Sequence, residues 1–237
     1  MNKPVLRVDW ATYEAAKYAC EKWHYSGCMP VGKLVKIGAW EDSKFIGVVI
    51  FGRGTNQHIG KDFGLSQTES IELVRVALTK HLSTVSRIVS VSIRFLKQQS
   101  KGIKVIVSFS DTSHGHHGGI YQAGNWIYAG FGTSDKRCQS YIKDGKSYQW
   151  RSVCAELGTK GLRRTISDAE KIGFLPKGFS PKHKYLMPLD DEMRKRIAPL
   201  AQPYPKRVKK QDSECPSELG GAVPTDTLQN AAVNPAE

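Results

Sequence analysis

The most constraining feature of this sequence is a stretch in which the hydrophobic period changes twice. Residues 71–79 (IELVRVALT) form a β-type run, and residues 103–111 (IKVIVSFSD) form a second run that is apolar enough for a buried strand. Between them, residues 83–99 place their apolar side chains on one helical face, and Ser83 or Thr84 can cap the first turn. Strand, helix and strand in succession predict an α/β layer structure.

The segments on either side extend this pattern. Residues 11–24 are rich in Ala, Glu and Lys, which predicts a helix. Two β-type runs within residues 34–52 surround a polar turn at 41–44, which indicates a hairpin. The remaining predicted elements are a short helix over 120–126, a strand over 127–131 and a second hairpin around Asp144-Gly145.

Length and composition limit the domain organisation. With 237 residues the chain is long enough for one substantial domain, and 40% hydrophobic residues are enough to form a core. The last part of the chain is rich in Pro, Gly, Ala and Ser and has no hydrophobic period. We therefore expect a single folded domain over 1–205 and a disordered tail over 206–237.

Charge is distributed unevenly along the chain. Lys and Arg outnumber Asp and Glu by 35 to 22, which gives a net charge of +13. Five of the acids and none of the bases lie after residue 210, so residues 1–210 carry about +18. A folded body this basic is expected to attract a polyanion. Nucleic acid is one such partner, and an anionic membrane or the phosphate of a cofactor is another.

Cysteine spacing and hydropathy narrow the class of protein. The five cysteines form no CxxC pair and are odd in number, so neither a disulfide framework nor a zinc ribbon fits. No apolar stretch near the N-terminus is long enough for a signal peptide, and none along the chain is long enough to span a bilayer. We expect a cytoplasmic protein that has no membrane partner.

A cluster of titratable residues follows the apolar strand predicted over 103–111. Asp111 ends that strand, and His114, His116 and His117 come next, in the run DTSHGHHGG. Function in open α/β sheets gathers at the carboxyl ends of strands. A carboxylate and three imidazoles can bind a metal, transfer protons or contact phosphate. The alternative is an exposed polar turn whose histidines are solvated.

Two further groups of polar residues are candidates for function. His24, Tyr25 and Ser26 follow the first helix and combine a group that titrates near neutral pH with a phenol donor. A helix-end cap is the alternative. Within the strand 71–79, alternation assigns Glu72 to one face and Arg75 to the other. Charged side chains in an apolar strand are costly to bury unless paired, so a structural ion pair or an edge strand is the alternative there.

Aromatic side chains lie close to these polar motifs. They are Trp23, Tyr25, Tyr121, Trp126 and Tyr128. Such rings can stack on a base that has left the double helix, as enzymes that modify bases require. The alternative is that they belong to the core.

Residues 120–131 (IYQAGNWIYAGF) resemble the segment that ends the acyl-CoA-binding half of GNAT acyltransferases. The predicted order of elements also resembles that fold, which implies a mixed central sheet with helices on both faces. GNAT proteins usually carry a glycine-containing loop after the fourth strand, where backbone amides hold the CoA pyrophosphate. Residues 79–87 (TKHLSTVSR) contain no glycine, which leaves hydroxyl groups and the helix N-terminus as phosphate ligands.

A larger set of sequence blocks resembles the Mom family of bacteriophage DNA-modification proteins. In order, the blocks are HYSG, WEDSKFIGVVIFGRG, ELVRVAL, IVSFSD and GHHGGIYQAGNWIYAG. The match runs from Val5 to Gly132 and continues through the DGK hairpin to Leu189. The resemblance implies conversion of adenine to N6-carbamoylmethyladenine in the double-stranded DNA of a phage, which protects that DNA from host restriction enzymes.

The same resemblance implies a set of pocket residues. They are His24, Tyr25 and Ser26; Glu72 and Arg75; Ser108 and Asp111; His116; Tyr121, Gln122 and Asn125; and Tyr128. It also implies iron as a cofactor, for which His24, Asp111 and His116 are the candidate ligands. Acetyl-CoA and another acyl or glycyl donor stay open as the source of the added group, because a carbamoylmethyl group joined through its CH₂ is not the product of simple acyl transfer.

The chemistry of adenine N6 suggests a role for each residue. Its lone pair is delocalised and the base is stacked, so the base must leave the helix and a general base must take a proton. The expected roles are Asp111 or His24 as general base, Tyr25 or Tyr121 as proton donor, Trp126 and Tyr128 as stacking partners, and Arg163, Arg164 and Lys182 as phosphate contacts. Two other functions stay open: a conventional GNAT acetyltransferase of protein or small-molecule amines, and a non-enzymatic basic DNA-binding protein.

Overall fold

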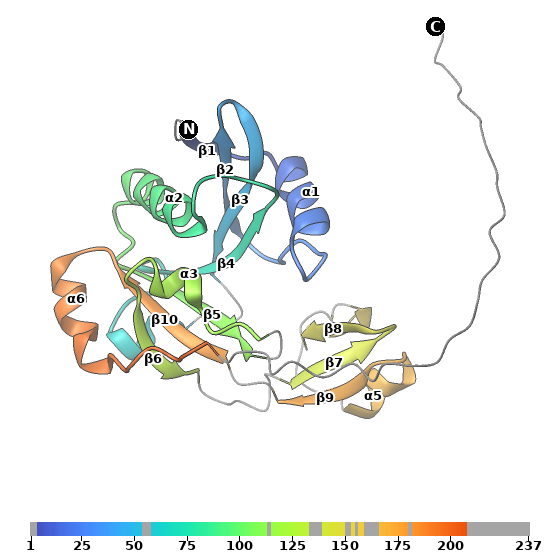
Figure 1. Cartoon of the computed structure of the whole chain (residues 1–237). Helices are drawn as coiled ribbons and strands as arrows, with labels where there is room; N and C mark the ends of the chain where they lie inside the picture. Colours follow the sequence, from blue (N-terminus) through green and yellow to red (C-terminus); the bar gives the residue numbers. More distant parts are fainter. Residues whose placement is uncertain are drawn as a thin grey trace, which may run out of the picture. The chain divides into compact units, whose positions relative to one another are not determined.

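The structure contains a large and a small β-sheet. It is a computed structural model that describes residues 4–53, 58–112, 115–132, 139–149, 153–154, 156–158, 166–179 and 182–207. The large sheet has the strand order β1-β2-β3-β4-β5-β10-β6 (Figure 1). Its strands are β1 (Leu6–Trp10), β2 (Leu34–Glu41), β3 (Lys44–Gly52), β4 (Ser70–Leu78), β5 (Val105–Asp111), β6 (Ile127–Phe131) and β10 (Lys182–Pro188). The small sheet is formed by β7 (Gln139–Lys143), β8 (Lys146–Gln149) and β9 (Leu175–Phe179).

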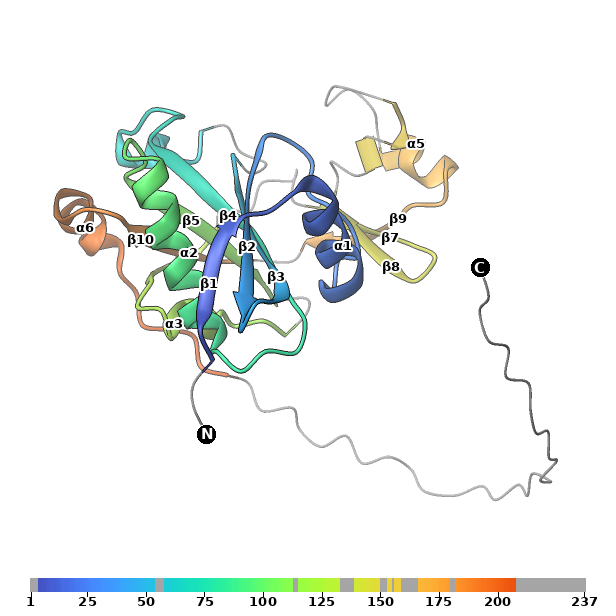
Figure 2. The same cartoon turned by 90° about the horizontal axis from the view of Figure 1, so that it is seen from above.

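Helices cover both faces of the large sheet, as Figure 2 shows for α1 and α2. The described helices are α1 (Tyr13–Trp23), η1 (Lys61–Phe63), α2 (Val85–Gln99), α3 (Gly119–Gln122), α5 (Ile166–Lys171), α6 (Asp191–Ile197) and η4 (Ala198–Leu200). On β3, Val48 and Ile50 pack against the buried face of α1, whereas Val49 and Phe51 pack against the side that α2 covers. Alternate residues of one strand thus serve two cores, and the predicted mixed sheet with helices on both faces is confirmed.

Local signals in the sequence account for several element boundaries. The Thr84 hydroxyl accepts a hydrogen bond from the Arg87 amide (3.3 Å) and caps α2, one of the two predicted caps. Asp42 and Ser43 adopt left-handed conformations (φ 46° and 69°), which form the tight turn between β2 and β3. Helix α3 ends at Gln122 and is shorter than the predicted 120–126, and Asn125 then turns the chain with φ 57°.

Strands β4 and β5 form the only parallel pair among the described strands of the large sheet, and α2 connects them. Their pairing runs from Ser70 opposite Val105 to Leu73 opposite Ser108 and goes no further. Both strands continue beyond that point, while β10 pairs with the other edge of β5 over its full length. The two strands therefore part at their carboxyl ends, which is where α/β sheets commonly bind ligands.

A β-bulge changes the face on which one predicted residue lies. Glu72 pairs with Gly52 and Arg75 pairs with Ile50, with a register shift between the two pairs. Since Ile50 and Gly52 are two residues apart on β3, they share a face, and so do their partners Glu72 and Arg75. The strict alternation that assigned these two charged residues to opposite faces is wrong.

Some features of the chain lie beyond what local sequence patterns indicate. Strand β10 enters the sheet antiparallel between β5 and β6, although β6 follows β5 far more closely in sequence. The predicted tail over 206–237 lies outside the described residues, apart from its first two. Each helix of the described chain is too short or too polar to cross a membrane.

Candidate functional site

The loop that follows α1 meets the bend that follows β5. The rings of Tyr25 and His116 lie 5.3 Å apart, centroid to centroid, at an interplanar angle of 76°. The His24 ring is a second neighbour of Tyr25, with the two ring centroids 4.2 Å apart. Two motifs that are remote in sequence, HYSG and the histidine-glycine bend, therefore form one site.

Hydrogen bonds fix the state of the His24 ring. Its Nδ1 accepts a hydrogen bond from the Ser26 amide at 3.1 Å and lies 2.8 Å from the Ser26 hydroxyl. A backbone N–H can only donate, so Nδ1 carries no proton and the neutral ring holds its proton on Nε2. In this arrangement His24 presents a donor, and its basic nitrogen is already engaged by Ser26.

Tyr25 lies among charged groups while part of its ring remains in solvent. Its side chain is 58% exposed. Desolvation by the surrounding protein raises the pKa of Tyr25; Arg75 lowers it, and Asp111 and Cys28 raise it further. The net shift is upward, so the phenol keeps its proton at neutral pH. The sequence did not predict Cys28 as a neighbour of Tyr25, although Cys28 directly follows the HYSG motif.

Asp111 is mostly buried beside a lysine. Its Oδ2 lies 3.5 Å from Nζ of Lys182, and the carboxylate side chain is 12% exposed. An ammonium group and a carboxylate attract each other more strongly where water is scarce. The sequence predicted Lys182 as a phosphate contact, but the structure pairs it with Asp111 at the end of β5.

Tyr121 takes part in a buried chain of hydrogen bonds. Ser108 Oγ lies 2.9 Å from the Leu73 carbonyl and 2.7 Å from the Tyr121 hydroxyl. Ser108 has one proton, which its hydroxyl can donate either to the Leu73 carbonyl or to the Tyr121 oxygen. Burial raises the pKa of Tyr121 to about 12, with the bond to Ser108 opposing it. The phenol interacts electrostatically with both Tyr25 and Glu72.

We refer to Tyr25, Arg75, Asp111, His116 and Tyr121 as the Tyr25 cluster. Each of them lies in the predicted site set, and the ring contact and electrostatic interactions above connect each of them to Tyr25. The cluster lies where β4 and β5 part. A carboxylate, a guanidinium, an imidazole and two phenols at one location are suited to proton transfer and to binding a polar planar substrate.

Side-chain hydrogen bonds hold the backbone of the histidine bend at His116 and His117. Both the Tyr185 hydroxyl (2.6 Å) and the Gln122 side-chain amide (3.0 Å) donate to the His117 carbonyl. The Ser110 hydroxyl donates to the His116 carbonyl at 3.0 Å. Gln122, predicted as a substrate contact, uses its amide nitrogen within the protein and is a positioning residue for the bend.

Three other predicted site residues have a structural place. Trp126 is 1% exposed and packs against Tyr121, and Tyr128 is 6% exposed and hydrogen-bonds the His183 ring at 2.8 Å. Both belong to the core, which was the alternative left open for them, and neither ring face is available to a base. Asn125 forms the left-handed turn after α3.

The basic cluster at 182–184 does not form a solvated surface. Lys184 lies 3.6 Å from Asp62, and only 18% of its side chain is exposed. His183 is 8% exposed, and burial followed by the nearby His117 lowers its pKa. Arg163 and Arg164, the other predicted phosphate contacts, lie outside the described residues.

The predicted iron ligands do not assemble a metal site in the part of the chain that the structure describes. Within it, no group of three or more His, Cys, Asp or Glu side chains is arranged to hold a metal ion. His24 directs Nδ1 to Ser26, and Asp111 pairs with Lys182. His114 lies outside the described residues. Iron therefore stays a prediction of the family resemblance, and the described donor set does not fit it.

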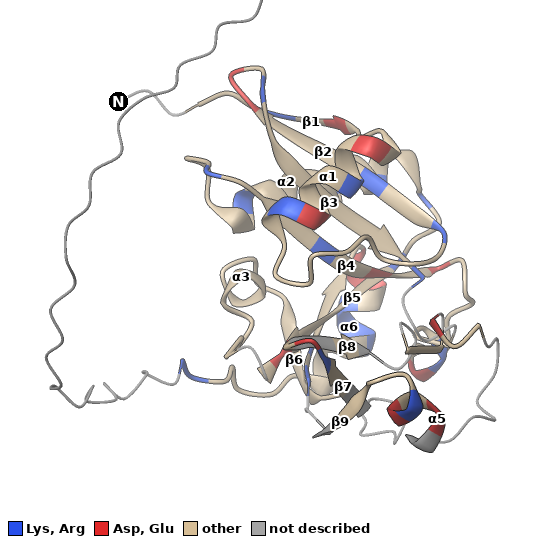
Figure 3. Cartoon of the chain, turned by 90° about the vertical axis from the view of Figure 1, so that its right-hand side faces the viewer, with Lys and Arg blue, Asp and Glu red and all other residues tan. Residues whose placement is uncertain are grey.

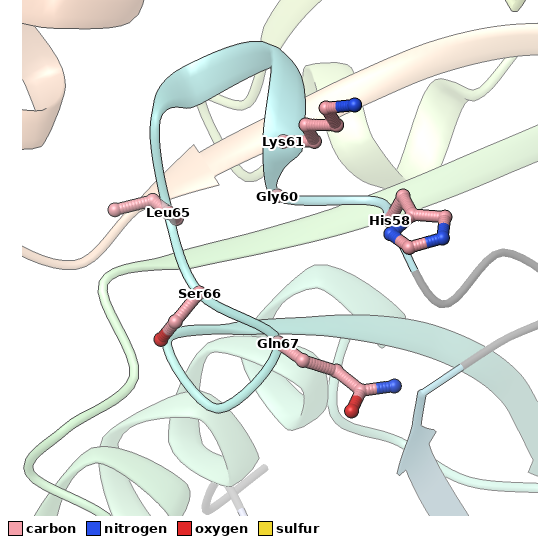
Figure 4. Close-up of a pocket in the computed structure, with 6 residues that line it drawn as sticks. All are labelled: His58, Gly60, Lys61, Leu65, Ser66 and Gln67. Carbon is pink, nitrogen blue, oxygen red and sulfur yellow. The ribbon is translucent and has the colours of Figure 1, made fainter.

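A separate hollow shares no lining residue with the Tyr25 cluster. It has a volume of about 280 Å³ and lies at η1 and the segment that leads into β4 (Figure 4). Its lining residues are His58, Gly60, Lys61, Leu65, Ser66 and Gln67. None of them belongs to the predicted site.

Comparison with known proteins gives three findings. The model of the Mom protein family matches residues 5–206. A protein named methylcarbamoylase mom, from Escherichia phage Mu, is 25% identical over 208 residues, which cover 85% of this chain and 84% of that protein. A solved structure of a candidate acetyltransferase from Acinetobacter baylyi ADP1 aligns with 80% of this chain and 95% of its own, at 12% identity and a TM-score of 0.43. That similarity is too low to support an inference.

Proposed function

The chain belongs to the Mom protein family, and on that premise we propose that it modifies adenine in phage DNA by adding a carbamoylmethyl group to N6, which protects the DNA from host restriction. The similarity to a protein named methylcarbamoylase supports the type of group added. The observation that carries the proposal is the contact between Tyr25 and His116, with Asp111 and Arg75 close enough to act electrostatically on Tyr25.

Asp111 is the general base of this proposal. As the new bond forms between N6 and the CH₂ of the donor, the donor's leaving group departs with the bonding electrons and the N6 proton passes to the Asp111 carboxylate. Lys182, whose Nζ lies 3.5 Å from Oδ2, holds that carboxylate in place. His24 is less suited to this role, because Ser26 already engages its basic nitrogen.

Tyr25 is the proton donor. Its raised pKa keeps the phenol protonated at neutral pH, and 58% of the residue is exposed to solvent, where a substrate can approach it. Tyr121 does not compete for this role, because the residue is only 8% exposed and its pKa is about 12. Arg75 supplies positive charge where negative charge develops on the leaving group.

The adenine has to leave the helix to reach these groups. Since Trp126 and Tyr128 are buried, we assign the stacking surface to the ring of Tyr25, which His24 supports from one side. Lys and Arg occur on several elements of the described chain, with Asp and Glu among them (Figure 3). We expect them to contact phosphates, so the affinity for DNA falls as salt rises, with a slope set by the number of contacts.

The decisive experiment is nucleoside mass analysis of plasmid DNA from cells that express the full chain. Wild type is expected to yield modified adenine, and Asp111→Asn is expected to reduce it by about 100-fold or more, since general-base catalysis contributes that much. Asp62→Asn is the matched control, because Asp62 also pairs with a lysine of β10 but lies outside the Tyr25 cluster. Absence of any adenine adduct with wild type would refute the proposed function and favour an acetyltransferase or a DNA-binding protein. Equal yields from both variants would refute the role of Asp111.

A further inference from the structure

A carboxylate from one strand binds the loop that leads into a helix elsewhere in the fold. The loop between β4 and α2 presents two backbone amides, Leu82 and Ser83, to Glu41 at the end of β2. The Leu82 amide donates to one Glu41 oxygen at 2.8 Å and the Ser83 amide donates to the other at 2.6 Å. Glu41 is only 7% exposed, so both bonds lie within the protein.

Elementary electrostatics explains why an anion is stable there. Backbone N–H groups ahead of a helix lack partners within it, and the positive end of the helix dipole favours negative charge. Burial raises the pKa of Glu41, but the bonds from Leu82 and Ser83, together with His81, outweigh it and leave the pKa below its ordinary value. Glu41 is therefore ionised at neutral pH.

A hydrogen bond between two residues of the loop also holds its backbone. His81 Nδ1 lies 2.6 Å from the Ser83 carbonyl, which can only accept, so the ring donates to it. No glycine occurs between Thr79 and Arg87, so the backbone here lacks the freedom that lets a loop wrap closely around a phosphate. The amides that face outward in a phosphate-binding loop are here turned to a side chain of the same protein.

We propose that Glu41 is the resident anion of this loop and that it excludes the pyrophosphate of a coenzyme A donor. The acyltransferase resemblance implies coenzyme A at this position, but the described amides do not fit it, because Glu41 already occupies them. The consequence for the donor rests on the proposed function: the donor of that reaction binds without a diphosphate contact at α2. The occupancy of the loop itself can be tested without any DNA modification.

The test compares thermal unfolding of the full chain in sodium pyrophosphate and in sodium chloride of equal ionic strength. Wild type is expected to show no gain in Tm from pyrophosphate over chloride. Glu41→Ala is expected to unfold several degrees lower in chloride and to recover much of that loss, saturably, in millimolar pyrophosphate, because the anion replaces the missing carboxylate. Asp190→Ala is the matched control: its carboxylate caps α6 through one amide, that of Met193, so the loss of Tm is expected without recovery.

Two results would overturn the proposal. One is equal stabilisation of wild type and Glu41→Ala by pyrophosphate, and the other is saturable binding of acetyl-CoA to wild type in isothermal titration. If Glu41→Ala does not fold, Glu41→Gln keeps the volume and one acceptor oxygen, and the same difference between the two salts is expected at smaller size. Failure here leaves the nucleoside analysis unaffected, so the two proposals fail separately.

Discussion

The rings of Tyr25 and His116 meet nearly at right angles, 5.3 Å apart. This contact joins the end of α1 to the bend beyond β5, and both segments are irregular. Each is held by its own hydrogen bonds, His24 with Ser26 on one side and Tyr185 with the His117 carbonyl on the other. The geometry of the site therefore depends on a few polar contacts in the loops as well as on the sheet below.

The hydroxyl of Tyr25 should matter for activity and hardly at all for folding. We expect Tyr25→Phe to keep the ring contact with His116 but to lower the yield of modified adenine by about 100-fold, the usual contribution of a proton donor. The free energy of unfolding should change by less than about 0.5 kcal/mol, because the side chain is largely exposed. Tyr18→Phe is the control, since Tyr18 is similarly exposed (52%) on α1 and should keep full activity. Full activity of Tyr25→Phe would rule out the donor role.

Two glycines of the histidine bend allow a matched test of how closely it is packed. Both have left-handed backbones, Gly115 with φ 67° and Gly118 with φ 81°. An added Cβ meets nothing within 4 Å at Gly115, but at Gly118 it lies 2.3 Å from the Tyr185 ring. Gly115→Ala should therefore cost about 1 kcal/mol of unfolding free energy from backbone strain. Gly118→Ala should cost about 3 kcal/mol or more and reduce DNA modification, because the ring that holds the His117 carbonyl must move.

Urea unfolding of the two glycine variants measures this difference, and the nucleoside assay measures its effect on the site. Similar losses of stability in both variants would show that strain alone operates and that Tyr185 is not packed as closely as described. A destabilised but fully active Gly118→Ala would separate the bend from function.

The sequence predicted the elements whose causes are local. Hydrophobic period and capping residues placed α1, α2, β4 and β5 to within two residues or so, because each depends on neighbours along the chain. The insertion of β10 between β5 and β6 depends on pairing between distant segments, for which a local pattern gives no signal. The bulge at Val74 was also missed, and with it the shared face of Glu72 and Arg75, because an extra residue breaks the alternation without changing composition.

The site was predicted in part for the same reason. Asp111 and His116 were identified by their position after a buried strand, and His24 and Tyr25 by polar character at the end of a helix. The sequence could not show which polar residues face the site and which hold the backbone, because that depends on tertiary contacts. Gln122, whose amide donates to the His117 carbonyl, is an example. The occupancy of the α2 loop by Glu41 could not be inferred either, since these residues lie about 40 positions apart.

The buried phenol of Tyr121 should make the free energy of unfolding depend on pH in the alkaline range. Its pKa is about 12 in the folded chain and about 10 when unfolded, so its contribution is fully present below pH 10 and is lost as pH rises towards 12. Linkage predicts a loss of about 1.4 kcal/mol by pH 11 from this group alone. We expect Tyr121→Phe to be about 1 kcal/mol less stable than wild type at pH 8, because the variant lacks the bond to Ser108, and to match or exceed wild type at pH 11.

Urea unfolding at pH 8 and pH 11 measures this difference. Both proteins share every other titrating group, so a difference in stability that stays constant between the two pH values would contradict a buried Tyr121 that keeps its proton. DNA modification by Tyr121→Phe should stay within about threefold of wild type, since the phenol is buried and bonded to Ser108 and does not face the substrate.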